Sequence, residues 1–484
     1  MKQRSNGGDR WWVLITFHGT IVNFDPVTRR LRHDAIGSRA ANVLATRDGA
    51  DTILFWRDGD MVRPLGRYGR DFCTFPIDDN PGVLTEEPAA RDLIALSCDG
   101  RYLCAEHDGT IAFSRLEALD WERFLVIDGD DLARVEFVLA NRWFSRLTGA
   151  LVEPESCRCV EPYTIQFGQT QVRIADIVHA ARATATKTMM PRDLFLTCDG
   201  WRVEHYVLFR PLAYFVAYGG DEIFQCAELA IQSLFAFGDW DGEVLVITDA
   251  GNIGFAERLP VEIRGRINVV PLPANDILDY TLARYKIADL GIREIYQPVI
   301  YMDTDIVCDA PVRTVLQAIA ASGDLQAWPE FPLGHPGDYY GQSLLEAERI
   351  AYDRNQSGFS SGIFAFRDIE EQRRLFSTIV DTAYRIAGLT GRRDAFEYYD
   401  QPMFNYVLFK TKQVIGAILK EAVELHLNHF PMLTIPVRKG FVHFAGGVGN
   451  ATPKLTHMKA YVEMLAREKI GLAALSSEFA AQRG

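Results

Sequence analysis

The chain has 484 residues, of which 48% are apolar, and it carries a formal net charge of −13. This length leaves room for two or three domains with cores of their own, and the apolar fraction is ordinary for a globular protein. The acidic balance argues against a general nucleic-acid binder, which would present a basic face. The sequence contains no apolar run of about 18 residues and no apolar segment at its start, so we expect neither a transmembrane segment nor a secretory signal.

The eight cysteines include no Cys-x-x-Cys pair. This usage indicates reduced thiols and a cytoplasmic location. Cys157 and Cys159 are close in sequence, but no second pair completes a zinc site with them.

The amino-terminal stretch, residues 11–205, alternates short strand-like segments with glycine turns that favour hairpins. Residues 43–49 are echoed by 94–100, and residues 57–62 by 107–112, at a period near 50. Together with Trp121-Glu122-Arg123-Phe124, this pattern resembles the repeats of fascin-like β-trefoils. The resemblance implies an all-β module over residues 1–130.

Residues 131–205 are predicted to form a β-rich extension or linker. Within them, 180–186 has the small residues of a linker or short helix, and 194–201 resembles a stray fourth repeat unit. A structural or targeting role and carbohydrate binding both remain open for the amino-terminal half, because fold alone does not establish function.

From residue 206 onward the pattern changes to alternating strands and helices. Strands are predicted at 212–218, 244–248, 267–271 and 299–307, and helices at 223–237 and 277–290. Such alternation predicts a mostly parallel sheet covered on both faces, in the manner of Rossmann-like α/β domains. Ligands of these sheets bind at the carboxyl ends of the strands, which is where Gly219-Gly220-Asp221 and Asp303-Thr304-Asp305 fall.

Asp303 and Asp305 are the strongest candidates for a metal site. At a strand end they would point the same way, since side chains alternate with period two, and a hard divalent cation between them would relieve their repulsion. The pattern Asp-x-Asp also occurs at 58/60, 128/130 and 239/241, but beside Gly or Trp in contexts that indicate solvated loops.

Five blocks in this half resemble, in order, the retaining GT-A glycosyltransferases of family 8, which include glycogenin and the lipopolysaccharide galactosyltransferases. They are 281–287, 299–307, Phe359-Ser360-Ser361-Gly362-Ile363, Tyr399-Asp400-Gln401-Pro402 and Val442-His443-Phe444-Ala445-Gly446. The resemblance covers about 212–455 and implies a GT-A domain over 206–484, with a last helix that opens at Thr452-Pro453.

The resemblance also implies a cofactor and partners. Asp303, Asp305 and His443 would hold Mn²⁺ or another divalent cation, which suits mixed carboxylate and imidazole ligands. The partners would be a nucleotide-sugar donor, UDP-linked in most of the family, and a glycan, protein or small-molecule acceptor. Asp400 and Gln401 would act on the face of the sugar away from the diphosphate.

The remaining donor-binding residues implied by the resemblance are Ala217, Tyr218, Asp221, Arg284, Lys286, Thr304, Ser361, Gly446 and Lys454. Two departures from the family pattern concern Lys454, which comes five residues late, and Ser360, which replaces an asparagine. Gly446, Gly447 and Gly449 could supply amide donors to the phosphates instead.

Several alternatives remain at this point. His443 could be a structural histidine, Asp400 a helix N-cap before Pro402, and Arg284 a surface partner of Asp279 or Asp289. At the level of function, the alternatives are a carbohydrate-binding or scaffold protein with an inactive transferase domain, and a sugar-phosphate nucleotidyltransferase. The latter would require a glycine- and arginine-rich loop where the chain has the acidic Gly219-Gly220-Asp221-Glu222.

Overall fold

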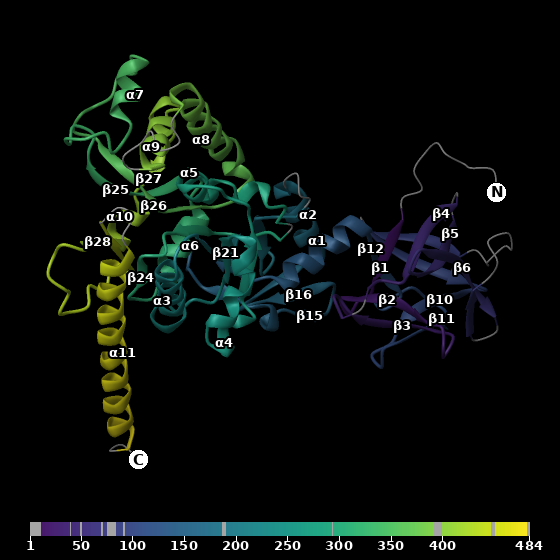
Figure 1. Cartoon of the computed structure of the whole chain (residues 1–484). Helices are drawn as coiled ribbons and strands as arrows, with labels where there is room; N and C mark the ends of the chain where they lie inside the picture. The colour runs from purple at the N-terminus through teal and green to yellow at the C-terminus, as the bar shows by residue number, and fades with distance from the viewer. Residues whose placement is uncertain are drawn as a thin grey trace. The chain divides into compact units, whose positions relative to one another are not determined.

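The computed structural model describes residues 11–38, 40–48, 51–68, 71–74, 84–90, 92–185, 190–292, 294–391, 399–446 and 451–481. The chain divides into two compact units, Met1–Leu208 and Phe209–Gly484 (Figure 1). Among the described residues, no helix combines the length and the apolar character needed to cross a membrane.

The first unit contains a large antiparallel sheet. Its twelve strands are β1 (Trp12–Ile15), β2 (Thr20–Asp25), β3 (Arg30–Ala35), β4 (Val43–Asp48), β5 (Asp51–Asp58), β6 (Met61–Tyr68), β7 (Asp71–Thr74), β8 (Leu84–Ala90), β9 (Leu93–Cys98), β10 (Arg101–Ala105), β11 (Thr110–Arg115) and β12 (Arg123–Asp128). Six of them pair in a closed circuit, β1–β4–β5–β8–β9–β12, which returns to β1. The other six form the hairpins β2–β3, β6–β7 and β10–β11.

Each strand of the circuit contributes an apolar side chain to one buried core. These side chains are Leu14, Val43, Leu54, Leu84, Ile94 and Phe124. A closed circuit leaves no unpaired edge strand, so these short strands are stabilised by their neighbours on both sides as well as by the core.

The glycine turns recur at a shorter period than the sequence echoes suggested. Gly19, Gly59 and Gly100 each follow the first strand of a group of four, and each has a positive φ of 73°, 57° and 69° respectively. In contrast, the echoed segments 43–49 and 94–100 belong to β4 and β9, which are the fourth and the first strand of their groups. The predicted period near 50 is therefore wrong, because it matched strands that are not equivalent.

The rest of the first unit combines two small sheets with two helices. Its elements are α1 (Gly129–Ala140), β13 (Trp143–Ser145), β14 (Leu151–Val152), a 3-10 turn at Pro154–Ser156, β15 (Arg158–Val160), β16 (Thr164–Phe167), β17 (Thr170–Arg173), α2 (Ile174–Thr184), β18 (Asp193–Cys198) and β19 (Arg202–Leu208). The sheets have the orders β14-β13-β19-β18 and β15-β16-β17.

This layout bears on three predictions. Residues 194–201 are not a fourth repeat unit, because β18 pairs with β19 in a sheet separate from the twelve strands. The small residues from Ala180 to Thr184 end helix α2, while 186 lies outside the described residues. β19 continues to Leu208, past the predicted domain boundary at residue 205.

The second unit is a mixed α/β domain. Its elements are β20 (Leu212–Val216), α3 (Asp221–Phe237), β21 (Glu243–Thr248), a 3-10 segment at Ala250–Arg258, α4 (Val261–Arg264), β22 (Ile267–Pro271), α5 (Ile277–Leu282), β23 (Val299–Met302), β24 (Ile306–Cys308), α6 (Arg313–Ala321), β25 (Leu325–Pro332), α7 (Gln342–Ala347), β26 (Ser357–Phe366), α8 (Ile369–Thr390), α9 (Gln401–Lys410), β27 (Ile415–Gly416), α10 (Ile418–Ala422), β28 (Val423–Leu427), β29 (Phe441–Ala445) and α11 (Ala451–Ala481). Its sheets have the orders β22-β21-β20-β23-β26-β25-β27 and β24-β29-β28.

The larger sheet contains a topological switch point. From β20 the chain adds β21 and then β22 on one side, all parallel, and later adds β23 parallel to β20 on the other side. At such a point the connections leave in opposite directions and open a crevice at the carboxyl ends of the strands. The residues that follow β20 and β23 therefore lie where an α/β sheet binds its ligand.

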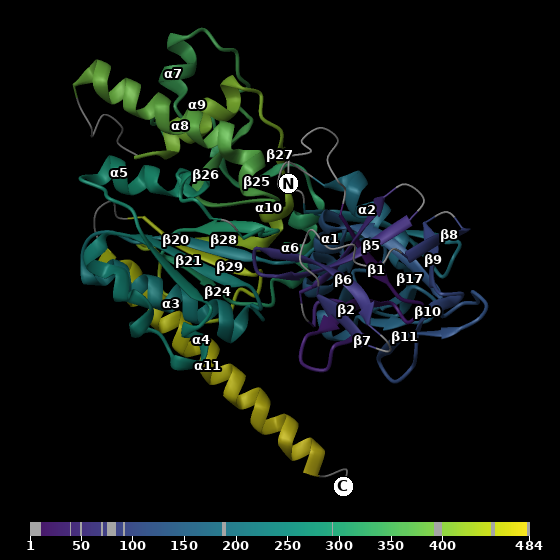
Figure 2. The same ribbon diagram turned by 90° about the vertical axis from the view of Figure 1, so that its right-hand side faces the viewer.

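Helices cover both faces of this sheet. Figures 1 and 2 show α8 and α9 on one side, and α3 and α4 on the other. The core on the α8 and α9 side includes Tyr214, Tyr301, Phe364, Phe376 and Phe404, all at most 1% exposed. Burial on this scale stabilises the fold by about 1.5–3 kcal/mol for each large apolar side chain.

Two predicted elements of this unit are shorter than expected. The strand predicted at 299–307 is two strands, β23 and β24, which belong to different sheets and are separated by Asp303-Thr304-Asp305. The helix predicted at 277–290 is α5 followed by two 3-10 turns, Ala283–Tyr285 and Ile287–Asp289. Arg284 lies in the first of these 3-10 turns, where it is buried.

Candidate active site

Asp303 and Asp305 lie in the turn that links β23 to β24, beside the switch point. Asp303 N donates to Gly362 O on β26 at 2.7 Å, and Phe444 N on β29 donates to Asp305 O at 2.9 Å. The two side chains are thus held by backbone bonds to two different sheets. The predicted reason for their convergence, strand alternation, is wrong, because neither residue is within a strand.

His443 reaches the same place from β29. It lies opposite Ile306 in the antiparallel pair β24–β29, and its Nε2 is 3.3 Å from Asp305 Oδ1. One ligand atom from each of Asp303, Asp305 and His443 lies within 4.8 Å of the others. The imidazole and Asp305 are buried, whereas the Asp303 side chain is 29% exposed.

The residues present fit a divalent cation. Asp305 Oδ1 is buried and has no hydrogen-bond partner among the described residues, which is costly for a carboxylate unless a cation reaches it. Gly362 borders the same space: a Cβ there would lie 2.8 Å from Asp303 Oδ2 and 2.9 Å from His443 Cε1. Two carboxylates and an imidazole are ligands for Mn²⁺-class ions.

Lys454, in the first turn of α11, also contacts this group. Its Nζ donates to Asp305 Oδ2 at 2.6 Å, although the lysine comes later in sequence than in the family pattern. Burial opposes the charging of Asp305, but Lys454 and His443 together outweigh it and hold the pKa of Asp305 below its usual value. Asp305 is therefore an anion at neutral pH.

Arg284 lies between Asp303 and Asp400. Its Nη1 is 3.3 Å from Asp303 Oδ1, its Nε is 3.6 Å from Asp400 Oδ2, and its guanidinium carbon is 4.8 Å from the centre of the Tyr301 ring. The residue is only 7% exposed. The alternative in which Arg284 pairs with Asp279 or Asp289 on a solvated face is wrong, since the 3-10 turn directs it into the domain.

Asp400 precedes α9, but its side chain makes no capping hydrogen bond. Instead its Oδ2 accepts a hydrogen bond from the Tyr285 hydroxyl at 2.7 Å. Burial raises the pKa of Asp400, and Arg284 and Tyr285 act in the opposite direction. The alternative in which Asp400 caps α9 is therefore wrong. The carboxylate is directed toward Arg284.

Gln401, which follows Asp400 in the chain, contacts Ser361 on β26 and Glu330 on β25. Its Oε1 accepts from Ser361 N at 3.2 Å, and its Nε2 donates to Glu330 Oε2 on β25 at 3.0 Å. Ser361 O in turn accepts from Arg284 Nη1 at 2.7 Å. Ser361 and Gln401 are thereby joined to the group formed by Arg284 and its carboxylates.

Other predicted donor-binding residues lie at the end of β20. Ala217 is buried, and its backbone bonds to Ile247 and Thr248 of β21. Tyr218 stacks on Tyr280 with ring centroids 4.9 Å apart. Asp221 is exposed at the first residue of α3 and pairs with Arg258 at 2.8 Å.

Three further predicted residues are placed as follows. Lys286 contacts Tyr384 on α8, with Nζ 3.0 Å from the hydroxyl, and none of its recorded contacts is to Asp303 or Asp400. Thr304 is half-buried in the turn between the two aspartates. Gly446 has a φ of 99°, which favours glycine, while Gly447 and Gly449 lie outside the described residues.

Three further residues belong to this group and are not predicted from the sequence. Tyr301 donates a short hydrogen bond to Asp303 Oδ1, Tyr285 donates to Asp400, and Glu330 accepts from Gln401 and from Tyr340. Tyr301 was detectable, because it lies two residues before Asp303 at the end of a strand. Nothing in the local sequence distinguishes Glu330, whose position depends on the pairing of β25 with β26.

Two of the other Asp-x-Asp pairs, 128/130 and 239/241, have local partners. Asp128 caps α1 by accepting from Asp131 N, and Asp239 and Asp241 both pair with Arg313. Asp58, Asp128 and Asp130 depart from the predicted solvated loops, because Asp58 ends β5, Asp128 ends β12 and Asp130 lies in α1. In the described parts of the chain, none of these pairs belongs to a group of three potential metal ligands.

No known family model and no curated protein matches this sequence. Among solved structures, the chain is similar to apo mouse xyloside xylosyltransferase 1, at a TM-score of 0.35 and 12% identity over 50% of this chain and 98% of that one. It is also similar to the galactosyltransferase LgtC in complex with donor and acceptor sugar analogues, at 0.36 and 16% over 52% and 96%. A third similarity is to the bifunctional glycosyltransferase WbbM, at 0.35 and 13% over 54% and 51%. At these TM-scores and identities, the similarities assign neither a family nor an activity to this chain.

Proposed function

We propose that residues 209–484 are a metal-dependent, retaining glycosyltransferase of the GT-A fold, which moves a sugar from a nucleotide sugar, UDP-linked in the first instance, to an acceptor hydroxyl. One observation carries the proposal: the residues of all five sequence blocks meet at the carboxyl end of β23. Arg284, Asp303, Ser361, Asp400 and His443 come from five segments that are far apart in the chain, yet contacts of 2.7–3.6 Å and the close group of metal-ligand atoms join them.

Asp303, Asp305 and His443 would hold the divalent cation. Such an ion, when bound, neutralises the diphosphate and assists its departure as a Lewis acid. Support comes from the buried Oδ1 of Asp305, which makes no hydrogen bond among the described residues and lies 3.3 Å from His443 Nε2, and from the space that Gly362 leaves beside Asp303 and His443. Manganese suits this mixed ligand set.

Lys454 and Arg284 provide the remaining positive charge. Lys454 would shift from Asp305 to a phosphate oxygen once the cation is bound, because the cation then takes over the neutralisation of Asp305. Arg284 would hold Asp303 and Asp400 at a fixed separation, and its planar fork would leave donors for sugar or phosphate oxygens. Tyr218 and Tyr280 present a stacked pair near the end of β20 that would contact the base.

Asp400 and Gln401 would face the sugar ring. A buried carboxylate there can stabilise a developing oxocarbenium ion or attack as a nucleophile, because it is desolvated and held by Tyr285 and Arg284. Both a single-face mechanism and a double displacement give a retained product. The hydrogen bond from Gln401 to Glu330 adds a further carboxylate to this polar group.

For the first unit we propose a β-trefoil followed by a small α/β extension. Supporting this are the closed circuit of six strands, the three hairpins and the three equivalent glycine turns. We assign this unit a structural or targeting role, with carbohydrate binding as the second candidate.

The function is tested by incubating the purified chain with a panel of nucleotide sugars and Mn²⁺, first alone and then with simple glycoside acceptors. We expect slow, metal-dependent release of the nucleotide from one donor, and transfer with retention of the anomeric configuration by NMR. An inverted product would contradict the retaining assignment. Binding of a donor without release or transfer would instead favour the inactive-scaffold alternative.

A further inference from the structure

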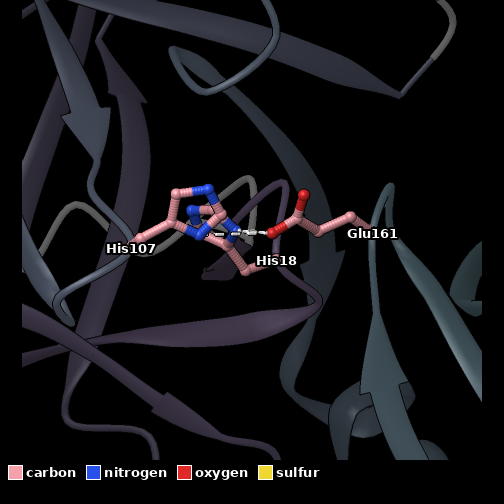
Figure 3. A group of neighbouring side chains, drawn as sticks. All are labelled: His18, His107 and Glu161. Atoms are coloured by element: carbon pink, nitrogen blue, oxygen red, sulfur yellow. Dashed lines mark hydrogen bonds and ion pairs between the residues drawn. The ribbon is translucent and has the colours of Figure 1, made fainter.

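A second group of metal-ligand side chains lies in the first unit. His18 is in the turn between β1 and β2, His107 in the turn between β10 and β11, and Glu161 directly after β15. One ligand atom from each residue lies within 4.8 Å of the others. Figure 3 shows both imidazole rings beside the same Glu161 carboxylate.

The contacts of His18 imply that a proton or a metal ion lies between its ring and Glu161. His18 Nε2 donates to the carbonyl oxygen of Ala105 at 2.9 Å, since a carbonyl can only accept. In the neutral ring, Nδ1 is then an acceptor, yet it faces Glu161 Oε1, also an acceptor, at 2.6 Å. Either a proton or a metal ion must therefore lie between these two atoms.

His107 favours the metal over the proton. Its Nδ1 is 3.5 Å from the same Glu161 oxygen, and its ring centroid is 4.7 Å from that of His18. A proton between His18 and Glu161 would involve only one of the two rings, and His107 would then face the carboxylate through its own neutral Nδ1–H. A metal ion instead binds both rings in their neutral form.

The surroundings of the group match a metal site. A ligating imidazole commonly donates its other N–H to a backbone carbonyl, as His18 does to Ala105, which fixes the orientation of the ring. Trp121 packs against both rings, with centroids 5.6 Å from His18 and 4.4 Å from His107. The orientation of the His18 ring is thereby fixed, and His107 packs against the same tryptophan.

The two distances to Glu161 require only a small adjustment, and the His18 and His107 ligand atoms lie within 4.8 Å of each other. Tetrahedral zinc ligands at about 2.0 Å from the ion lie roughly 3.3 Å apart. The distance of 3.5 Å between His107 and Glu161 already fits, and that of 2.6 Å between His18 and Glu161 must open by about 0.7 Å. The Glu161 side chain is 40% exposed and His107 is 62% exposed, so both are free to move by this amount.

We propose that His18, His107 and Glu161 bind a zinc-class divalent ion, with a fourth position open to water. Two imidazoles and one carboxylate favour such an ion over Mg²⁺ or Ca²⁺, which prefer oxygen ligands. Because Glu161 follows the separate strand β15, the ion would tie the small sheet β15-β16-β17 to the turns of the twelve-stranded sheet.

The test measures zinc bound to the full chain by equilibrium dialysis and calorimetry. The Asp303→Asn/Asp305→Asn double variant is the background, because it removes the carboxylates of the candidate active site. We expect it to bind one equivalent of zinc, and we expect His107→Gln or Glu161→Gln added to it to weaken that binding at least about tenfold. His107 and Glu161 are exposed, so these variants should fold even if His18→Gln does not.

His179→Gln is the matched control, because His179 is exposed on α2, away from the three ligands in sequence. It should bind zinc as the background does. Equal zinc affinity in the His107→Gln, Glu161→Gln and His179→Gln variants would overturn the proposal. So would a background variant that binds no zinc, which would leave a proton shared by His18 and Glu161 as the explanation of their contact.

Discussion

Arg284 lies between two carboxylates that the chain supplies from different elements, Asp303 after β23 and Asp400 before α9. Burying an ion group is costly unless each charge is paired and hydrogen-bonded. Here Tyr301 donates to Asp303, Tyr285 donates to Asp400, and Arg284 donates to Ser361 O. The charges of Arg284, Asp303 and Asp400 are therefore all paired within the protein. Asp305 Oδ1 makes no hydrogen bond among the described residues and faces His443, so it can bind a cation together with that histidine.

Asp400→Asn tests whether this carboxylate acts on the sugar. The amide can still accept from Tyr285, so we expect the free energy of unfolding to change by no more than about 1–3 kcal/mol. The loss of charge should reduce transfer per folded molecule at least about a hundredfold, or roughly 2.7 kcal/mol of barrier. Initial rates, normalised to the folded fraction from circular dichroism, measure this.

Asp289→Asn is the control, because Asp289 is exposed and pairs with Arg373 at the surface. It should transfer at the parental rate. If Asp400→Asn also transfers at the parental rate, Asp400 acts only as a structural partner of Arg284.

At the scale of elements, strand β26 forms one wall of the site through Gly362. This glycine has no positive φ, so its backbone alone would accept alanine. The constraint is spatial, since a Cβ would lie under 3 Å from both Asp303 and His443. The strand thus leaves a space at the point where three potential ligands meet.

Gly362→Ala should therefore weaken Mn²⁺ binding at least about tenfold, equivalent to about 1.4 kcal/mol, because the methyl group displaces the ligands. Calorimetric titration of Mn²⁺ in the presence of a nucleoside diphosphate gives the affinity. Gly388→Ala is the control: Gly388 is in helix α8 with no atom within 4 Å of an added Cβ, and alanine there should stabilise by about 0.5–1 kcal/mol without changing metal affinity. Unchanged metal affinity in Gly362→Ala would show that metal binding does not need the space beside Gly362.

The elements also show what the sequence could and could not predict. Parallel strands such as 267–271 are signalled by local apolar runs, and β22 has these bounds. The break between β23 and β24 was not predictable, because apolar residues continue on both sides of the aspartates. The number of residues between His443 and Lys454 did not predict that Lys454 contacts Asp305, because that contact depends on where α11 begins. Arg284 was identified as a candidate, but its inward direction follows from a 3-10 turn without a local signal.

At the scale of the whole molecule, the chain consists of two compact units with separate cores. All residues of the candidate active site belong to the second unit, and His18, His107 and Glu161 belong to the first. This division predicts that the chemistry of the second unit does not need the first unit to fold.

Expression of residues 209–484 alone tests this independence. We expect a cooperative melting transition, with a nucleotide-dependent shift that agrees with that of the full chain within about 2 °C. A soluble, folded fragment that fails to bind nucleotide would show that the first unit contributes to the site or that the boundary at Leu208 is misplaced.

The most direct measurement of the central claim is the melting temperature with a nucleotide sugar, with and without Mn²⁺, in the parent, in Asp305→Ala and in Asp60→Ala. Asp60 belongs to an exposed Asp-x-Asp pair and is the matched control. A donor at a hundred times its dissociation constant should stabilise the parent and Asp60→Ala by about 2.7 kcal/mol, and only when Mn²⁺ is present. Asp305→Ala should remain folded and show no Mn²⁺-dependent shift. An undiminished Mn²⁺-dependent shift in Asp305→Ala would contradict the assignment of a metal-dependent nucleotide-sugar site at the end of β23.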